Sequence, residues 1–256
     1  MKISGNTTLI TGGATGIGLA LAEKLIEKGN EVIICGRRED RLNDAKERIE
    51  RMHPGAKIHI RTCDVSDEGQ RTALVEWVTT EFPNLNVLVN NAGIQRDYHF
   101  LSTDEPWETT RQEIAINVEA PIHLSRLLVD HLRSVADATI VNVSSGLAFT
   151  PMALFPIYCA TKAAVHSLSL TMRHQLKEVG IEVIEVIPPA VDSELNMEGR
   201  VKRGMTTTGT TAEEFVSAVM AGFERGDSEI AYGSAIRGRA ASREELDEAF
   251  RRVNRS

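Results

Sequence analysis

Short apolar runs rich in valine and isoleucine recur along about the first 190 residues of the chain, and longer segments with helical spacing of apolar positions separate them. Runs this short, with apolar side chains at successive positions, are typical of strands that are buried on both faces of a sheet. The strands that we expect are residues 7–11, 32–35, 57–62, 87–89, 139–143 and 183–187.

The segments between these runs predict helices, because their apolar residues recur at intervals of three and four. We expect helices at residues 16–28, 40–52, 67–81, 106–135 (with a break) and 156–179. Strands that alternate with helices predict an α/β fold with a doubly wound parallel sheet, the Rossmann fold. No linker or shift in composition divides the chain, so we predict a single domain over residues 1–256.

The last quarter of the chain is less regular. Residues 192–211 are polar and contain three glycines, which predicts a small lid over the domain. A helix at residues 212–224 and a short strand at 229–232 follow. Ser242, with Glu245 three residues on, forms the sequence pattern of a capping box and predicts a C-terminal helix over residues 242–253.

Composition and charge narrow the choice of partners. A net charge of −7 argues against a nucleic-acid partner, which needs a basic face. The three cysteines and the histidines at positions 99, 131, 166 and 174 lack metal-ligand spacing, so we predict free thiols in a reducing compartment and no metal. No apolar run approaches the roughly 20 residues of a membrane helix, and no signal-like segment precedes the first strand. We therefore expect a cytoplasmic protein without a membrane partner.

A glycine-rich turn between the first strand and the first helix is the first sign of chemistry. Glycines permit a positive φ and a close approach of the backbone to a pyrophosphate, whose charge the helix N-terminus then stabilises. The alternative is a turn that binds nothing, which the strand before it and the helix after it disfavour. The predicted dinucleotide contacts in this turn are Gly12, Thr15, Gly16, Ile17 and Gly18.

The residues after the second and third strands indicate which dinucleotide binds. Gly36 stands where many such folds have an acid for the ribose 2′-hydroxyl, and Arg37 and Arg38 follow it. Two guanidinium groups suit a 2′-phosphate, so we predict NADP(H) over NAD(H); the alternative is that they are solvated loop charges. Asp64, followed by Val65, is placed to accept a hydrogen bond from the adenine amino group or, alternatively, to form a turn.

Tyr158 and Lys162 are four residues apart at the start of a predicted helix, which places them on one helix face. A phenol with a pKa of about 10 is a poor acid–base catalyst at neutral pH. A neighbouring ammonium favours the phenolate and lowers that pKa, so the pair suits proton transfer.

Taken together, these features resemble the short-chain dehydrogenase/reductase family over nearly the whole chain. The motifs that carry the resemblance are the turn at 11–18, Asn-Asn-Ala-Gly at 90–93, Asn117, the serines at 144–145, Tyr158 and Lys162. The resemblance implies an NAD(P)-dependent oxidoreductase that interconverts a carbonyl and an alcohol. Within the family, the stretches at 93–96, 147–151 and 186–192 resemble the DltE-type oxidoreductases.

The resemblance also implies a role for each catalytic residue. Tyr158 exchanges the proton with the substrate oxygen, and Ser145 donates a hydrogen bond to that oxygen. Lys162 lowers the pKa of the tyrosine and binds the nicotinamide ribose, and Asn117 holds a water that links the lysine to solvent. Ser145, and not Ser144, precedes the tyrosine by 13 residues, the spacing usual in the family.

Further contacts follow from the same resemblance. The additional cofactor contacts that it implies are Asn91, Ala92, Gly93, Pro188, Val191 and Ser193. The family often has Pro-Gly and then a threonine after the sixth strand; here Pro189 replaces the glycine and lacks its conformational freedom. The substrate-side candidates are Gln95, Leu147, Phe149 and Phe155, joined by Met152 and Leu195. This mainly apolar set predicts a hydrophobic carbonyl or alcohol, unless its members are plain core residues.

Two other classes of function stay open. The chain would be a catalytically silent NADP-sensing regulator if it bound the nucleotide without chemistry, although the intact catalytic set argues against this. It would be a structural partner if its long helices served only to dimerise. The resemblance implies a homodimer or homotetramer through helices near residues 119–135 and 156–178, which is compatible with catalysis.

Overall fold

The order of the strands in the sheet differs from their order along the chain. The computed structural model describes residues 1–101, 106–204 and 209–254. Its sheet has the order β3-β2-β1-β4-β5-β6-β7, with every pair parallel. The strands are β1 Thr7–Thr11, β2 Glu31–Gly36, β3 Ile58–Thr62, β4 Leu85–Asn90, β5 Thr139–Val143, β6 Glu182–Ile187 and β7 Glu229–Ala231.

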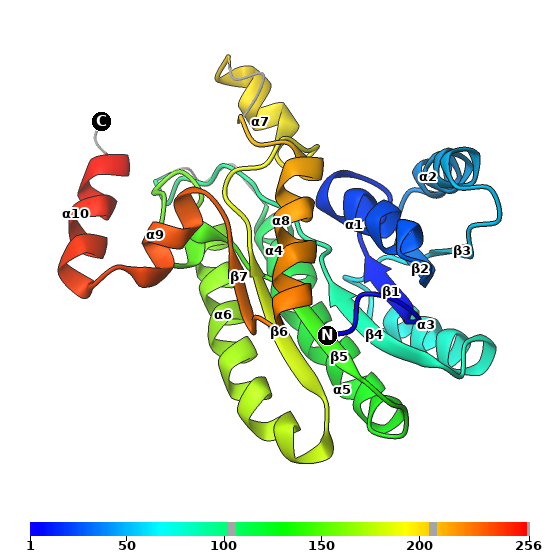
Figure 1. The fold of residues 1–256 in the computed structure, drawn as a ribbon. Coiled ribbons are helices and arrows are strands. Elements are labelled where there is room, and N and C mark those ends of the chain that lie inside the picture. The colour runs from blue at the N-terminus through cyan, green and yellow to red at the C-terminus, as the bar shows by residue number, and fades with distance from the viewer. Residues whose placement is uncertain (102–105, 205–208, 255–256) are drawn as a thin grey trace.

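Helices cover both faces of the sheet, which confirms the doubly wound α/β fold (Figure 1). One core cluster packs α1 Gly16–Glu27, α2 Glu39–Met52 and α8 Ala212–Arg225 against the sheet. The other packs α3 Glu68–Glu81, α5 Ala120–Leu132 and α6 Pro156–Leu176. Every residue of β1, β4 and β5 is buried, as strands covered on both faces require.

The helix expected over 106–135 is broken, as predicted, and the break is a π-helical turn. It consists of α4 Trp107–Ile114, the turn η1 Ala115–Glu119 and α5. Such turns are rare and often occur at functional sites. The capping box at Ser242 and Glu245 is confirmed at the start of α10 Arg243–Val253, which has no buried residue and projects from the body (Figure 1).

Three short helical segments were not predicted: η2 Gly146–Ala148, α7 Met197–Lys202 and α9 Ser234–Ala240. Helix α7 lies inside the predicted lid, of which residues 205–208 lie outside the described residues. A lid function for this segment and the single-domain organisation stay predictions. Within the described ranges, no helix is long and apolar enough to cross a membrane.

The strand order places a crevice at the carboxyl ends of β1 and β4. The chain runs from β1 to β2 and β3 on one side, then crosses to β4 on the other side of β1. Ligands of such sheets bind where the order reverses in this way. The glycine turn follows β1, and the remaining predicted site residues lie in the segments that follow the strands β2 to β6.

Candidate active site

The glycine turn after β1 has the backbone that a dinucleotide requires. Gly12 and Gly16 have φ values of +64° and +56°, which favour glycine. A Cβ on Gly12 would lie 3.0 Å from the Cα of Ala92, and one on Gly18 would lie 2.3 Å from the carbonyl oxygen of Gly12. Helix α1 begins at Gly16, and the side chain of its N-cap Thr15 makes no capping bond. The crowded turn and the open helix N-terminus fit a bound pyrophosphate.

Two polar side chains hold this turn against β4. The hydroxyl of Thr11 accepts hydrogen bonds from the N–H groups of Asn91 and Ala92, both at 3.0 Å. The Nδ2 of Asn91 donates to the carbonyl oxygens of Thr11 (2.9 Å) and Gly12 (3.1 Å). The side chain of Asn91, which we expected to contact the cofactor, is therefore bound to the turn itself.

The arginines after β2 are exposed, and one of them is already paired. The Nη2 of Arg38 lies 2.6 Å from Oε2 of Glu194, and Arg41 lies 3.5 Å from the other carboxylate oxygen. Glu194 belongs to the segment after β6, so it links that segment to the start of α2. Arg37, the residue before Arg38, is also exposed.

The residues after β3 form a local turn. The Oδ1 of Asp64 accepts from the N–H (2.9 Å) and the hydroxyl (2.7 Å) of Ser66. Val65 is buried, and its carbonyl oxygen accepts from Arg71 at 2.6 Å. Asp64 thus has the turn-forming role that its sequence context left open, while the adenine contacts of Asp64 and Val65 stay predictions.

Ser145, Tyr158 and Lys162 meet at the carboxyl end of β5. The hydroxyl of Ser145 lies beside Tyr158, near enough to lower the pKa of the phenol. The Nζ of Lys162 donates to the carbonyl oxygen of Val143 at 2.8 Å and lies 5.6 Å from the ring centroid of Tyr158. Ser144 instead donates to Glu185 at 2.5 Å, so the serine that meets the tyrosine is the one chosen by sequence spacing.

Burial dominates the ionisation of the tyrosine and the lysine, which are 6% and 4% exposed. Burial raises the pKa of Tyr158 above its usual value, while the hydrogen bond from Ser145 lowers it. Burial lowers the pKa of Lys162 to about 8, and the carboxylate of buried Glu113 on α4 opposes this shift. The same carboxylate raises the pKa of Tyr158 further.

Burial thus outweighs the effect that we expected Lys162 to have on the pKa of Tyr158, and this role of the lysine stays a prediction. The ammonium is itself destabilised by burial, and its Nζ is held at the carbonyl oxygen of Val143. A buried phenol that retains its proton at neutral pH is an acid rather than a base.

Asn117 lies in the π-helical turn, and its side chain binds protein at both ends. Its Oδ1 accepts from the N–H of Ile94 (2.9 Å), and its Nδ2 donates to the carbonyl oxygen of Ile94 (2.9 Å) and to the hydroxyl of Thr161 (3.1 Å). The amide thus ties the segment after β4 to α6, and the water contact expected of Asn117 stays a prediction. Gly93 lies at the same corner, where an added Cβ would be in ordinary contact with Nζ of Lys162 at 3.6 Å.

The segment after β6 lies across the glycine turn. The carbonyl oxygen of Pro188 accepts from the N–H of Gly146 at 2.9 Å, and Val191 is buried and bridges to Thr210. A Cβ on Gly16 would lie 3.0 Å from the Cβ of Ser193. A cleft of about 670 Å³ adjoins this contact, and its lining includes Ala14, Thr15, Gly16, Ser193 and Glu194.

A carboxylate from the other side of the site also binds this segment. Asp97, after β4, accepts from Nδ2 of Asn196 at 2.8 Å and pairs with Arg203. The segment around α7 is thus bound on one side by Asp97 and on the other by Arg38.

Apolar side chains gather around the tyrosine. Phe155, Tyr158 and Cys159 form a buried cluster, against which Leu147, Met152, Leu154 and Leu195 pack. Phe149 instead packs edge-on against the ring of His166, with centroids 4.7 Å apart. Gln95 is half-buried on the segment after β4.

Sequence reasoning missed four residues that shape the site: Thr11, Glu113, Glu185 and Glu194. Thr11 opens the glycine turn, and the other three belong to no motif that we recognised. The one available signal was an acid at an apolar position of a strand or helix, as for Glu113 and Glu185, which are 2% and 0% exposed.

Comparisons with known proteins agree with this geometry. The chain is 50% identical over 254 residues to the uncharacterized oxidoreductase DltE of Bacillus subtilis, covering 99% of this chain and 98% of that protein. It is 32% identical to 17-beta-hydroxysteroid dehydrogenase type 3 of Danio rerio over 233 residues, which are 90% of this chain and 73% of that protein. A short chain dehydrogenase from Burkholderia cenocepacia, solved in complex with NADP, superposes with a TM-score of 0.81 at 27% identity, covering 98% of this chain and 99% of that chain.

The family assignment follows from the extent of the match. The model of the short chain dehydrogenase family matches residues 6–204, which contain every motif discussed above. The chain therefore belongs to the short-chain dehydrogenase family of oxidoreductases.

Proposed function

We propose that this protein interconverts an apolar carbonyl compound and its alcohol by hydride transfer with NADP(H), and that Tyr158 exchanges the proton. The observation that carries the proposal is the convergence of two hydroxyls, those of Ser145 and Tyr158, beside the buried ammonium of Lys162. They lie at the same edge of the sheet as a glycine turn whose backbone fits a dinucleotide.

The bound nicotinamide would supply or accept the hydride, and the chain's own residues handle the proton. In reduction, Tyr158 donates its proton to the carbonyl oxygen while Ser145 donates a hydrogen bond to the same atom. The raised pKa of Tyr158 keeps this proton in place at neutral pH. Lys162, with a pKa of about 8, is the neighbouring group that can return a proton to the phenolate.

Oxidation requires the reverse transfer, in which Tyr158 accepts the alcohol proton. Burial opposes ionisation of the phenol, so oxidation should gain rate as the pH rises. The rate of reduction relative to oxidation should therefore be higher near neutral pH than at alkaline pH.

The residues around the sheet edge would divide the cofactor among them. Gly12, Thr15, Gly16, Ile17 and Gly18 would hold the pyrophosphate through backbone N–H groups, with Asn91 bracing the turn. The adenosine end would contact Asp64 and Val65, and the nicotinamide end Ala92, Gly93, Lys162, Pro188, Val191 and Ser193. Asn117 would act as a positioning residue through Ile94 and Thr161.

The preference for NADP(H) rests on Arg37 and Arg38, two guanidinium groups at the adenosine corner. Fluorescence titration of NADPH and NADH against the wild type and Arg37→Ala tests it, with Arg51→Ala, at the far end of α2, as the control. We expect NADPH to bind more tightly than NADH and Arg37→Ala to abolish the difference. A preference for NADH would overturn the assignment.

The proposed substrate class rests on the apolar cluster around Tyr158. The side chains that pack there are apolar: Leu147, Met152, Phe155 and Leu195. The name of the Danio rerio relative, a hydroxysteroid dehydrogenase, fits an apolar substrate of this kind. Homodimer or homotetramer formation through α5 and α6 is part of the proposal, and sedimentation would test it.

A panel of apolar aldehydes and ketones with NADPH tests the reaction, with the alcohol identified as the product. Tyr158→Phe should remove turnover while nicotinamide fluorescence still reports binding. Nucleotide binding without turnover in the wild type would instead favour the NADP-sensing regulator.

A further inference from the structure

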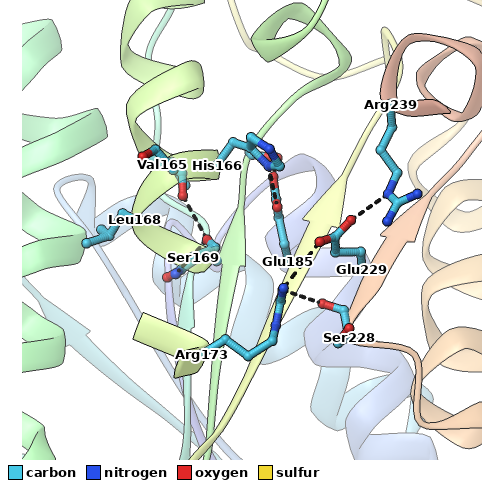
Figure 2. A network of polar contacts seen from close by, with 12 residues as sticks. Val165, His166, Leu168, Ser169, Arg173, Glu185, Ser228, Glu229 and Arg239 are labelled. Atoms are coloured by element: carbon cyan, nitrogen blue, oxygen red, sulfur yellow. Dashed lines mark hydrogen bonds and ion pairs between the residues drawn. The ribbon is translucent and has the colours of Figure 1, made fainter. Parts of the chain in front are cut away.

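The interface between β6 and α6 contains a carboxylate that the proposed mechanism does not use. Glu185 lies on β6 and faces His166 of α6 (Figure 2). It is completely buried. A buried carboxylate is strongly destabilising unless its oxygens find partners. Here Oε1 accepts from the hydroxyl of Ser144 at 2.5 Å, and Oε2 lies 2.8 Å from Nδ1 of His166. Both oxygens are thus committed to side chains of two other elements.

Those elements carry the proposed catalytic residues. Ser144 directly precedes Ser145 at the end of β5. His166 lies on α6 eight residues after Tyr158, about two turns further along the same side of the helix. Glu185 therefore links the strand end that bears the serine to the helix that bears the tyrosine.

Successive residues of this strand end face α6. Val143 accepts a hydrogen bond from Lys162 and Ser145 lies beside Tyr158, while the serine between them reaches α6 through Glu185 and His166. Polar bonds have preferred directions and lengths, so they fix the position of the strand end more narrowly than apolar contacts do. The distance between the two proposed catalytic hydroxyls depends on this position.

His166 also supports the loop that follows β5. The ring of Phe149 packs edge-on against the imidazole, with 4.7 Å between centroids and 62° between the ring planes. This arrangement is favourable for aromatic pairs. The imidazole thus contacts the loop beyond the serine as well as the carboxylate behind it.

A second carboxylate on the neighbouring strand offers a contrast (Figure 2). Glu229, on β7, pairs with Arg173 of α6 at 3.2 Å and with Arg239 of α9 at 2.5 Å. Among the described residues, none of its hydrogen bonds or ion pairs reaches β5. It ties α6 to the sheet without contact with the strand end that bears Ser145.

We propose that Glu185 and His166 are positioning residues: they hold the end of β5 against α6 so that the hydroxyl of Ser145 meets that of Tyr158. The inference rests on the proposed function. Both residues act through Ser145 and take no part in hydride or proton transfer themselves.

Two variants test the role. Glu185→Leu removes both bonds but keeps the volume, and such replacements of buried charges often leave stability unchanged. Ser144→Ala removes one bond with a much smaller change and decides the question if the first variant fails to fold. We expect each to lower kcat about tenfold, because small misplacements of reacting groups are costly. The Kd of NADPH should stay within about twofold, since the glycine turn lies on β1, beyond β5 and β4.

The decisive measurement repeats both substitutions in a Ser145→Ala background, using the best-reduced carbonyl of the panel. Because the residues act through this hydroxyl, their effect on kcat should shrink to less than about twofold there. The matched control Glu229→Leu also removes a carboxylate that is paired with α6, and it should keep kcat within about twofold.

Three results would overturn the inference: an undiminished loss in the Ser145→Ala background, an equal loss in Glu229→Leu, or full activity in Glu185→Leu and Ser144→Ala. Failure of the proposed function is distinguishable. It would appear as full turnover by Tyr158→Phe, or as no turnover of any carbonyl by the wild type, and the positioning role would fall with it.

Discussion

Replacing Glu194 by glutamine removes the carboxylate that pairs with Arg38 and Arg41 and keeps the size of the side chain. If NADPH places its 2′-phosphate on Arg38, the nucleotide must first separate the arginine from this carboxylate. NADH has no 2′-phosphate and does not compete for the pair. Glu194→Gln is therefore expected to tighten the binding of NADPH and to leave that of NADH unchanged.

The magnitude follows from the exposure of the pair. The side chains of Arg38, Arg41 and Glu194 are 53%, 46% and 35% exposed, so solvent screens both interactions. Exposed ion pairs contribute about 0.2–1 kcal/mol each, and the 3.5 Å contact is the weaker one. Release of both should contribute about 0.5–1 kcal/mol, which lowers the Kd of NADPH about two- to fivefold.

Nicotinamide fluorescence titrations of NADPH and NADH measure this effect at low salt and again at about 0.5 M salt, where screening should reduce it. Glu198→Gln is the matched control, because the ion pair of Glu198 within the described ranges is inside α7, with Lys202. An equal change for both nucleotides, or weaker binding of NADPH, would refute the competition between the carboxylate and the 2′-phosphate.

Two further predictions concern the turn and the proton path. Gly12→Ala should lower the free energy of unfolding by about 1–2 kcal/mol because of the positive φ of Gly12, and it should also weaken NADPH binding. The control is Gly29→Ala, since Gly29 has a φ of +81° and no atom within 4 Å of an added Cβ. It should lower thermal stability but leave NADPH binding unchanged. Glu113→Gln removes a charge that raises the pKa values of both Tyr158 and Lys162. In a pH–rate profile of alcohol oxidation, the rise of the rate should therefore move to lower pH. A rise that stays at the same pH or moves to higher pH would contradict this.

The sequence predicted the sheet and most of its helices because strands buried on both faces leave uninterrupted apolar runs. β1 and β5 match their predicted bounds, since each is buried throughout. The helices α7 and α9 were not predicted because they have only 6 and 7 residues, too few for a periodic pattern. Each of them also contains a glycine.

The site was predictable where a motif fixes a backbone or a helix face. The glycine turn and the spacing of Ser145, Tyr158 and Lys162 are of this kind. The effect of burial on pKa was not predictable, because burial depends on what the rest of the chain packs around the pair. The role of Glu185 was also not predictable, since an acid inside an apolar strand finds its partners, Ser144 and His166, only in the folded chain.

The central claim is that Tyr158 exchanges the proton with the substrate. Its most direct test is the single-turnover rate of NADPH oxidation at saturating carbonyl for the wild type, Tyr158→Phe and the neighbouring control Cys159→Ala. The proposed mechanism predicts that Tyr158→Phe is at least about 100-fold slower, while NADPH binding and the Cys159→Ala rate stay near those of the wild type. A Tyr158→Phe rate within about threefold of the wild type would contradict it.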